Sequence, residues 1–165
     1  MILKEIETKI NEQVFAEAKS SHLYLSMASW AETKGYAGVA KFFYLHSDEE
    51  REHMLKLIKY INERGGHALI PSIPQPLKVF DCLAHVFKDF LDHEVAISNM
   101  INGLVDLCLK NKDYTTHNFL QWYVAEQIEE EALARTILDK LKLIGDDKGG
   151  LYLFDRDLEK FPTDE

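Results

Sequence analysis

The residues best suited to chemistry are acids, a histidine and an amide that interrupt apolar helical stripes. In four segments, apolar residues recur every three or four positions, as they do on one face of an amphipathic helix. Polar side chains break each stripe near its middle: Glu17 in the first segment, Glu50 and His53 in the second, Glu94 in the third, and Gln127 and Glu130 in the fourth. Because an isolated buried carboxylate is strongly disfavoured, four such interruptions indicate a shared ligand.

The spacing of these polar residues repeats between the two halves of the chain. Glu17 precedes Glu50 by 33 residues, and Glu94 precedes Gln127 by the same 33 residues. If each half folds as a helical hairpin, equivalent polar groups lie at equivalent heights. Stacking the hairpins about a pseudo-two-fold axis then brings all of them to one level of the core.

The charge of this cluster fits two divalent cations. Four glutamates contribute about four negative charges, and His53 adds a neutral nitrogen ligand. Without metal the carboxylates would repel one another and some would hold protons. Carboxylate oxygens with one imidazole suit iron or manganese, whereas thiolates, which favour zinc or copper, are missing from the set. The alternative is a buried hydrogen-bonded cluster without metal.

A second group of polar residues lies beside the first. The acids Glu49, Glu126 and Glu129 fall just off the core stripes and could hold a further, wetter cation. A solvated acidic helix face explains them equally well on spacing alone. Tyr24 could hydrogen-bond a ligand or donate an electron, or could simply be a tyrosine at the edge of the core. For His46 the favoured interpretation is packing, with an extension of the site as the alternative.

Long helices must position these side chains. Helical periodicity predicts four helices over 4–34, 38–64, 81–110 and 116–144, and a short fifth near 151–160. Thr116 is the expected N-cap of the fourth helix, and Gly65 and Gly145 are expected C-terminal stops. Short links predict two helical hairpins. The proline-containing link 65–80 can extend to roughly 53 Å, enough to run the length of the bundle. The sequence therefore predicts an all-α four-helix bundle with one long crossover, rather than a floppy loop joining neighbouring ends.

Composition limits the class of protein. The chain of 165 residues is expected to form a single domain, 1–165, and its net charge of −9 argues against binding to nucleic acid or an anionic membrane. The N-terminus has no secretory apolar core, and no apolar run is long enough to span a membrane, so a cytoplasmic location is expected. Cys82 and Cys108 form no C-x-x-C pair and are both expected to be buried, inert thiols.

With these features in place, the sequence resembles the bacterial non-haem ferritins over essentially its full length. The matching motifs are N-E-Q near the start, H-x-x-E-E-x-x-H at 46–53, H-E at 93–94, N-F-L-Q-W-Y-V-x-E-Q-x-E-E-E at 118–131 and G-L-Y at 150–152. The run at 118–131 is long and specific. The fold that the resemblance implies is the ferritin-like bundle, with a short fifth helix lining four-fold axes.

The resemblance also implies roles for individual residues. In the family pattern Glu17, Glu50 and His53 hold one iron, Glu94, Gln127 and Glu130 serve the other, and Glu50 bridges the two. Glu49, Glu126 and Glu129, with Glu130 shared, match a third iron site, and Tyr24 and Trp122 match aromatic residues near the centre.

Two departures from related patterns are informative. Bacterioferritins carry a haem-ligating methionine two residues after the second-helix glutamate, and this chain has Glu52 there, so no haem is expected. Animal-type ferritins place acids at the three-fold pores, where this chain has His117 and Leu120, which puts an acidic entry route in doubt.

The function implied is iron storage with ferroxidase activity. Family members oxidise Fe(II) with O2 or H2O2 and deposit ferric oxyhydroxide inside a hollow shell of 24 identical subunits. The first alternative is a di-iron, peroxide-scavenging enzyme of the rubrerythrin type, against which the missing C-x-x-C pairs argue. The second is a structural bundle without metal.

Overall fold

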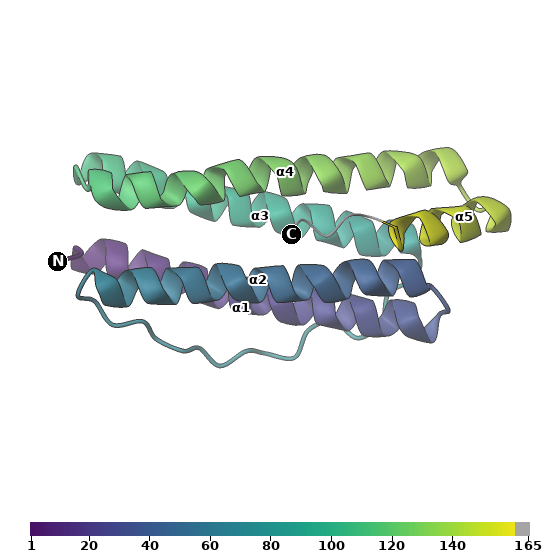
Figure 1. Ribbon diagram of the computed structural model, residues 1–165, viewed down its shortest axis with the longest axis horizontal. Helices are drawn as coiled ribbons and strands as arrows, with labels where there is room; N and C mark the ends of the chain where they lie inside the picture. The colour runs from purple at the N-terminus through teal and green to yellow at the C-terminus, as the bar shows by residue number, and fades with distance from the viewer. Residues whose placement is uncertain (161–165) are drawn as a thin grey trace.

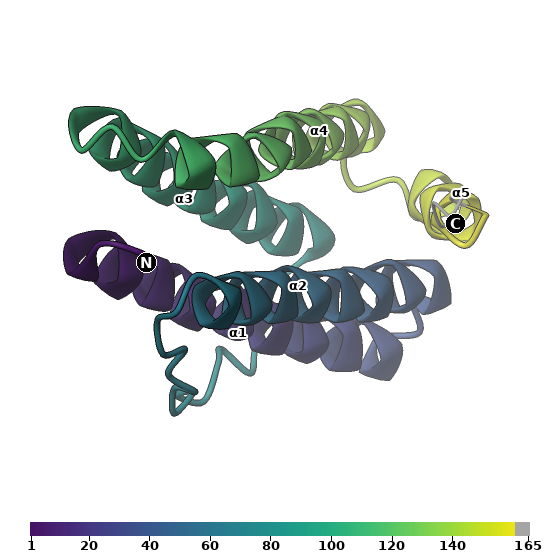
Figure 2. The same ribbon diagram turned by 60° about the vertical axis from the view of Figure 1, so that its left-hand side comes forward.

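The computed structural model describes residues 1–160, and within that range it consists of helices and their connections, with no strands. The helices are α1 (Lys4–Thr33), α2 (Ala37–Glu63), α3 (Leu83–Lys110), α4 (Tyr114–Ile144) and α5 (Lys148–Leu158). Two antiparallel hairpins, α1 with α2 and α3 with α4, lie side by side with α5 at one end (Figures 1 and 2). The predicted all-α four-helix bundle with a fifth helix is confirmed.

The long connection between the hairpins follows α1 along the outside of the bundle (Figure 1). Near its start the Leu69 amide donates to Asn11 Oδ1 at 2.7 Å, and near its end the Ser26 hydroxyl donates to the Leu77 carbonyl oxygen. Asn11 and Ser26 are separated by about 22 Å of helix at 1.5 Å per residue. The predicted crossover is therefore confirmed, and the bundle has the one-crossover topology.

Both predicted helix stops are found. Gly65 has a φ of 76° just after α2, and Gly145 has a φ of 59° at the end of α4. This left-handed region favours glycine, because a Cβ would crowd the backbone.

The predicted start of α4 is wrong. The N-cap is Asp113, whose Oδ1 accepts the Thr116 amide at 3.0 Å, so Thr116 lies inside the helix and is buried. Both residue types cap helices well, but Asp113 also pairs with Arg64, the residue that follows α2, at 3.3 Å. That tertiary contact decides between the two caps.

Two other details differ from expectation. Helix α5 covers Lys148–Leu158 rather than 151–160, because the Asp147 side chain caps it by accepting the Gly150 amide. Cys82 is exposed, since it is the residue before the first turn of α3, whereas Cys108 is buried as predicted. Burial raises the pKa of the Cys108 thiol to about 11.

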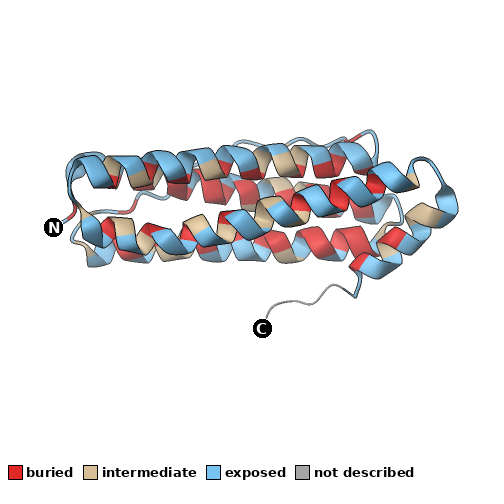
Figure 3. Ribbon diagram, turned by 90° about the horizontal axis from the view of Figure 1, so that it is seen from above, coloured by how far each residue is buried: buried red, intermediate tan, exposed pale blue. Residues whose placement is uncertain are grey.

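The core has two apolar halves with a polar layer between them. One half, near α5, is rich in aromatic residues such as Phe43, Phe87 and Phe90. The other, near the N-terminus, is mainly aliphatic and includes Ile10 and Leu57. Figure 3 shows buried residues along the inward faces of the helices. None of the helices described is long and apolar enough to cross a membrane.

Helix α5 closes one end of the bundle by packing against α2. The Val39 amide donates to Asp155 Oδ1 at 2.9 Å, and the Phe154 ring lies 5.9 Å from that of Phe87 in an edge contact. Gly38 allows this approach, because a Cβ there would collide with the Asp155 carbonyl oxygen.

Candidate metal centre

The first hairpin brings three predicted ligands together in the polar layer. Glu17 of α1 and Glu50 and His53 of α2 each offer a ligand atom within 4.8 Å of the others. Their exposed fractions are 1%, 3% and 8%. Glu50 and His53 share a face of α2 because they are three residues apart, and His53 Nδ1 lies 3.7 Å from Glu50 Oε2.

Three buried carboxylate oxygens in this layer accept no hydrogen bond from the described residues: Glu17 Oε2, Glu50 Oε2 and Glu130 Oε2. Histidine nitrogens lie 3.7 and 3.5 Å from the last two. Burial raises the pKa of Glu17 well above its usual value, and the charge of Glu50 raises it further. Burial likewise raises the pKa of Glu50, and the charge of Glu94 adds to the effect. Unsatisfied oxygens in a group of mutually repelling carboxylates are what a cation would satisfy.

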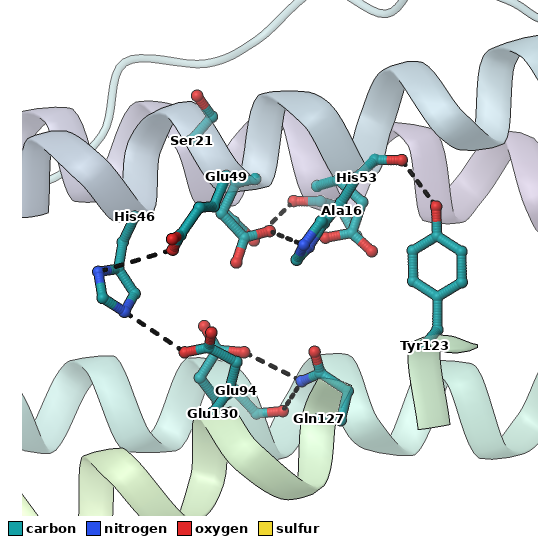
Figure 4. A network of polar contacts seen from close by, with 12 residues as sticks. Ala16, Ser21, His46, Glu49, His53, Glu94, Tyr123, Gln127 and Glu130 are labelled. Atoms are coloured by element: carbon teal, nitrogen blue, oxygen red, sulfur yellow. Dashed lines mark hydrogen bonds and ion pairs between the residues drawn. The ribbon is translucent and has the colours of Figure 1, made fainter. Parts of the chain in front are cut away.

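The second hairpin supplies the opposite wall of the layer. Gln127 Nε2 of α4 donates to Glu94 Oε2 of α3 at 3.0 Å, and the Tyr24 hydroxyl donates to Glu94 Oε1. Burial raises the pKa of Glu94 to about 7, although these two hydrogen bonds oppose the shift. Tyr24 is fully buried, so it is not a tyrosine at the edge of the core. Figure 4 shows Glu94, Gln127 and Glu130 facing His53 across the gap between the hairpins.

His46 of α2 contacts acids of both hairpins. Its Nε2 lies 3.5 Å from Glu130 Oε2 and its Nδ1 lies 3.9 Å from Glu49 Oε2 (Figure 4). The Nδ1 also lies 2.9 Å from the Phe42 carbonyl oxygen, which favours a proton on Nδ1. Burial lowers the pKa of His46, but the hydrogen bond and charge of Glu130 outweigh it, so the net shift is upward.

The remaining predicted acids line a groove of about 780 Å³ between α2 and α4. Glu49, Glu126 and Glu129 all contribute to it, but only Glu49 lies within 4.8 Å of both His46 and Glu130 as a ligand group. The structure therefore brings His46, which the sequence interpretation treated mainly as packing, closer to this cluster than two of the expected acids.

Aromatic residues border the groove and the centre. The Trp122 ring lies 5.1 Å from that of His53 in an edge contact, and Lys56 Nζ lies 3.1 Å from the centre of the Trp122 ring. The Tyr123 hydroxyl donates to the His53 carbonyl oxygen at 2.8 Å. Together these contacts hold the His53 segment of α2 against α4.

One buried residue near the centre was missed by the sequence analysis. Gln13 is fully buried and its Nε2 donates to Glu17 Oε1 at 2.8 Å. Its position four residues before Glu17 places both on one helix face, a signal that the sequence contained. His93 contacts α1 instead of the ligands: its Nε2 lies 2.7 Å from Ser20 Oγ, and burial lowers its pKa to about 4.

Three comparisons with known proteins agree on a family. The Ferritin model, described as a ferritin-like domain, matches residues 7–144. A bacterial non-heme ferritin of Campylobacter jejuni is 46% identical over 156 residues, covering 94% of this chain and 93% of that protein. A probable bacterial non-heme ferritin-like protein of Haemophilus influenzae is 43% identical over 99% of both chains. The open pore ferritin of the archaeon Archaeoglobus fulgidus superposes with a TM-score of 0.96 at 37% identity, covering 99% of this chain and 100% of that one. The resemblance inferred from the motifs is confirmed, and the chain belongs to the ferritin family.

Proposed function

We propose that this protein stores iron: it oxidises Fe(II) with O2 or H2O2 at the polar layer and holds the ferric mineral inside a hollow shell of 24 copies. The observation that carries the proposal is the set of buried carboxylate oxygens that accept no hydrogen bond, contributed by both hairpins at one level of the core. Membership of the ferritin family supports the same function.

The side chains divide into two metal positions. Glu17, Glu50 and His53 hold the first Fe(II), Glu94, Gln127 and Glu130 serve the second, and Glu50 faces both. Each Fe(II) gives one electron, and the two electrons with two protons reduce O2 to H2O2. Anionic ligands favour Fe(III) over Fe(II), so the carboxylates assist the oxidation. In this role iron is the substrate of the site: Fe(II) binds, is oxidised and leaves as Fe(III), which is ferroxidase activity.

The carboxyl groups also exchange protons for cations. With a pKa near 7, Glu94 is partly protonated in the metal-free protein at neutral pH. Binding of Fe(II) displaces such protons, since a coordinating carboxylate must be ionised. Tyr24 remains a neutral donor, because burial raises its pKa well above the usual value. Its hydroxyl steadies the Glu94 carboxylate and is placed to supply an electron.

A third iron position is proposed in the groove between α2 and α4. Glu49, Glu126 and Glu129 line this groove, and Glu130 connects it to the second position. His46 contacts both Glu130 and Glu49, so it is a further ligand at this third position. This position is more open than the first two, which suits it to passing iron onward.

Other parts of the proposal follow from features of the sequence. The chain 1–165 acts as a single domain, needs no haem, and works in the cytoplasm without binding nucleic acid or membrane. Residues 161–165 lie outside the described part of the chain. His117, half-buried, and Leu120, fully buried, offer no acid at the three-fold positions of the animal-type ferritins, so an acidic entry route there stays in doubt.

The test is aerobic Fe(II) oxidation followed by stopped-flow absorbance. Glu50→Ala and His53→Ala should each slow the initial rate strongly, whereas Asp48→Ala, which changes an exposed acid on the same helix outside the groove, should not. Wild-type rates in both site variants would refute the assignment of the centre.

Shell formation separates the proposal from the rubrerythrin-type alternative. On size-exclusion chromatography after iron loading, the protein should run near 24 subunits and retain hundreds of iron atoms or more. A small oligomer that turns over peroxide and retains only a few irons would instead support the alternative.

A further inference from the structure

A chain of hydrogen bonds runs from the metal centre to the surface of the α3/α4 hairpin. Gln127 Nε2 lies 3.4 Å from Ser98 Oγ, and Ser98 Oγ lies 2.6 Å from Glu131 Oε1. Arg135 Nη1 then lies 2.8 Å from Glu131 Oε2. Gln127 is buried, Ser98 and Glu131 are half-buried, and Arg135 is exposed. The chain therefore links a buried amide to an exposed ion pair.

The direction of these hydrogen bonds follows from the groups involved. Glu131, paired with Arg135, is an ionised carboxylate, and a carboxylate can only accept. The single proton of the Ser98 hydroxyl is therefore donated to Glu131. The lone pairs of Ser98 Oγ remain, so toward Gln127 this oxygen acts as an acceptor.

The amide of Gln127 is thereby oriented. Its nitrogen faces three acceptors on α3: Glu94 Oε2 at 3.0 Å, the Glu94 carbonyl oxygen at 3.2 Å and Ser98 Oγ at 3.4 Å. A flipped amide would set its oxygen against those acceptors and lose every one of these bonds. With the nitrogen held at α3, the amide oxygen is directed into the gap between the hairpins (Figure 4).

We propose that Ser98 and Glu131 are positioning residues, which fix the amide of Gln127 so that its carbonyl oxygen is presented to the second metal position. This inference rests on the proposed function, because it requires that cations bind beside Gln127. Neither Ser98 nor Glu131 reaches the centre itself. Both act through the orientation of Gln127, as outer residues orient the ligands of other metal sites.

The test is titration of the assembled, metal-free protein with Co(II), followed by visible absorption, which reports the ligands of each bound ion. Wild type should bind two Co(II) per chain at the centre. Ser98→Ala should weaken the second binding step about tenfold, within the range usual for loss of an outer hydrogen bond. Ser98→Thr keeps the hydroxyl and should restore the wild-type affinity and spectrum.

Glu131→Gln provides an independent variant. Its amide can donate to Ser98, which frees the hydroxyl proton to turn toward the Gln127 nitrogen, so the second step should again weaken about tenfold. Thr136→Ala is the matched control: its exposed hydroxyl lies on the same helix but bonds the Ala132 carbonyl oxygen. Gln127→Ala sets the full effect of losing the amide.

The outcomes separate the inference from the proposed function. If wild type binds fewer than two Co(II) per chain, the dinuclear centre itself is refuted, and the inference with it. If wild type binds two and Gln127→Ala is impaired, but Ser98→Ala and Glu131→Gln match wild type, only the inference is refuted. Equal weakening of both binding steps in Ser98→Ala would also refute it, because the effect would then be general rather than confined to the second position.

Discussion

The protonated state of Glu94 predicts an unusual dependence of stability on pH in the metal-free protein. Its carboxyl is fully buried and its pKa is raised from 4.5 to about 7. Between these values the unfolded chain has released the proton while the folded chain still holds it. Stability contributed by Glu94 is therefore complete below pH 4.5 and is lost as the pH rises to about 7.

The size of this effect can be worked out. A rise in the Glu94 pKa from 4.5 to about 7 corresponds to roughly 3 kcal/mol of unfolding free energy per chain. For a chain of this length, that shifts the melting temperature by about 6–12 °C. The raised pKa values of Glu17 and Glu50 act in the same direction. A bound divalent cation replaces the protons, so saturation with Zn(II) should stabilise the protein more at pH 7 than at pH 5.

The assay is differential scanning calorimetry of the metal-free protein between pH 4.5 and 8. Glu94→Gln removes the titrating group, so its melting temperature should fall less steeply across pH 4.5–7 than that of wild type. The slope of melting temperature against pH is compared, and the absolute stability is not, because the new amide at position 94 also lies against the Gln127 nitrogen and this contact changes stability at every pH. Asp92→Asn, an exposed carboxyl on the same helix, is the control and should keep the wild-type slope. Identical slopes for wild type and Glu94→Gln would refute the reasoning.

Three further predictions concern the bundle and its centre. Gly38→Ala should detach α5, because the added Cβ collides with the Asp155 carbonyl oxygen; limited proteolysis would then cut near the C-terminus of the variant but not of wild type. Asp113→Ala should lower stability by about 1–3 kcal/mol, since it removes the N-cap of α4 and leaves Arg64 unpaired; a melting temperature equal to that of wild type would contradict this. Tyr24→Phe should slow Fe(II) oxidation about tenfold while the shell still assembles, because the hydroxyl that steadies a ligand is lost; an unchanged stopped-flow rate would argue against that role.

Much of the fold was predictable because the signals are local. Helical periodicity and glycine stops gave four long helices with ends within two residues of those observed. The link 65–80 could be recognised as a crossover from its length and its three prolines. The errors occurred at helix ends, where Asp113 and Thr116 are both good caps and the choice depends on Arg64 in another hairpin.

For the candidate site, the sequence determined which side chains can act as ligands and which height of the core they share. Spacings of three, four and 33 residues do this, because helix geometry converts them directly into faces and levels. Tertiary structure alone decided which atoms meet. It turned His46 toward Glu130, buried the Tyr24 hydroxyl against Glu94, and left Glu126 and Glu129 further out in the groove. The physical reason is that periodicity fixes the angle of a side chain about its own helix. Which atoms of the two hairpins meet depends instead on how the hairpins pack against each other, and residues far apart in the sequence contribute to that packing.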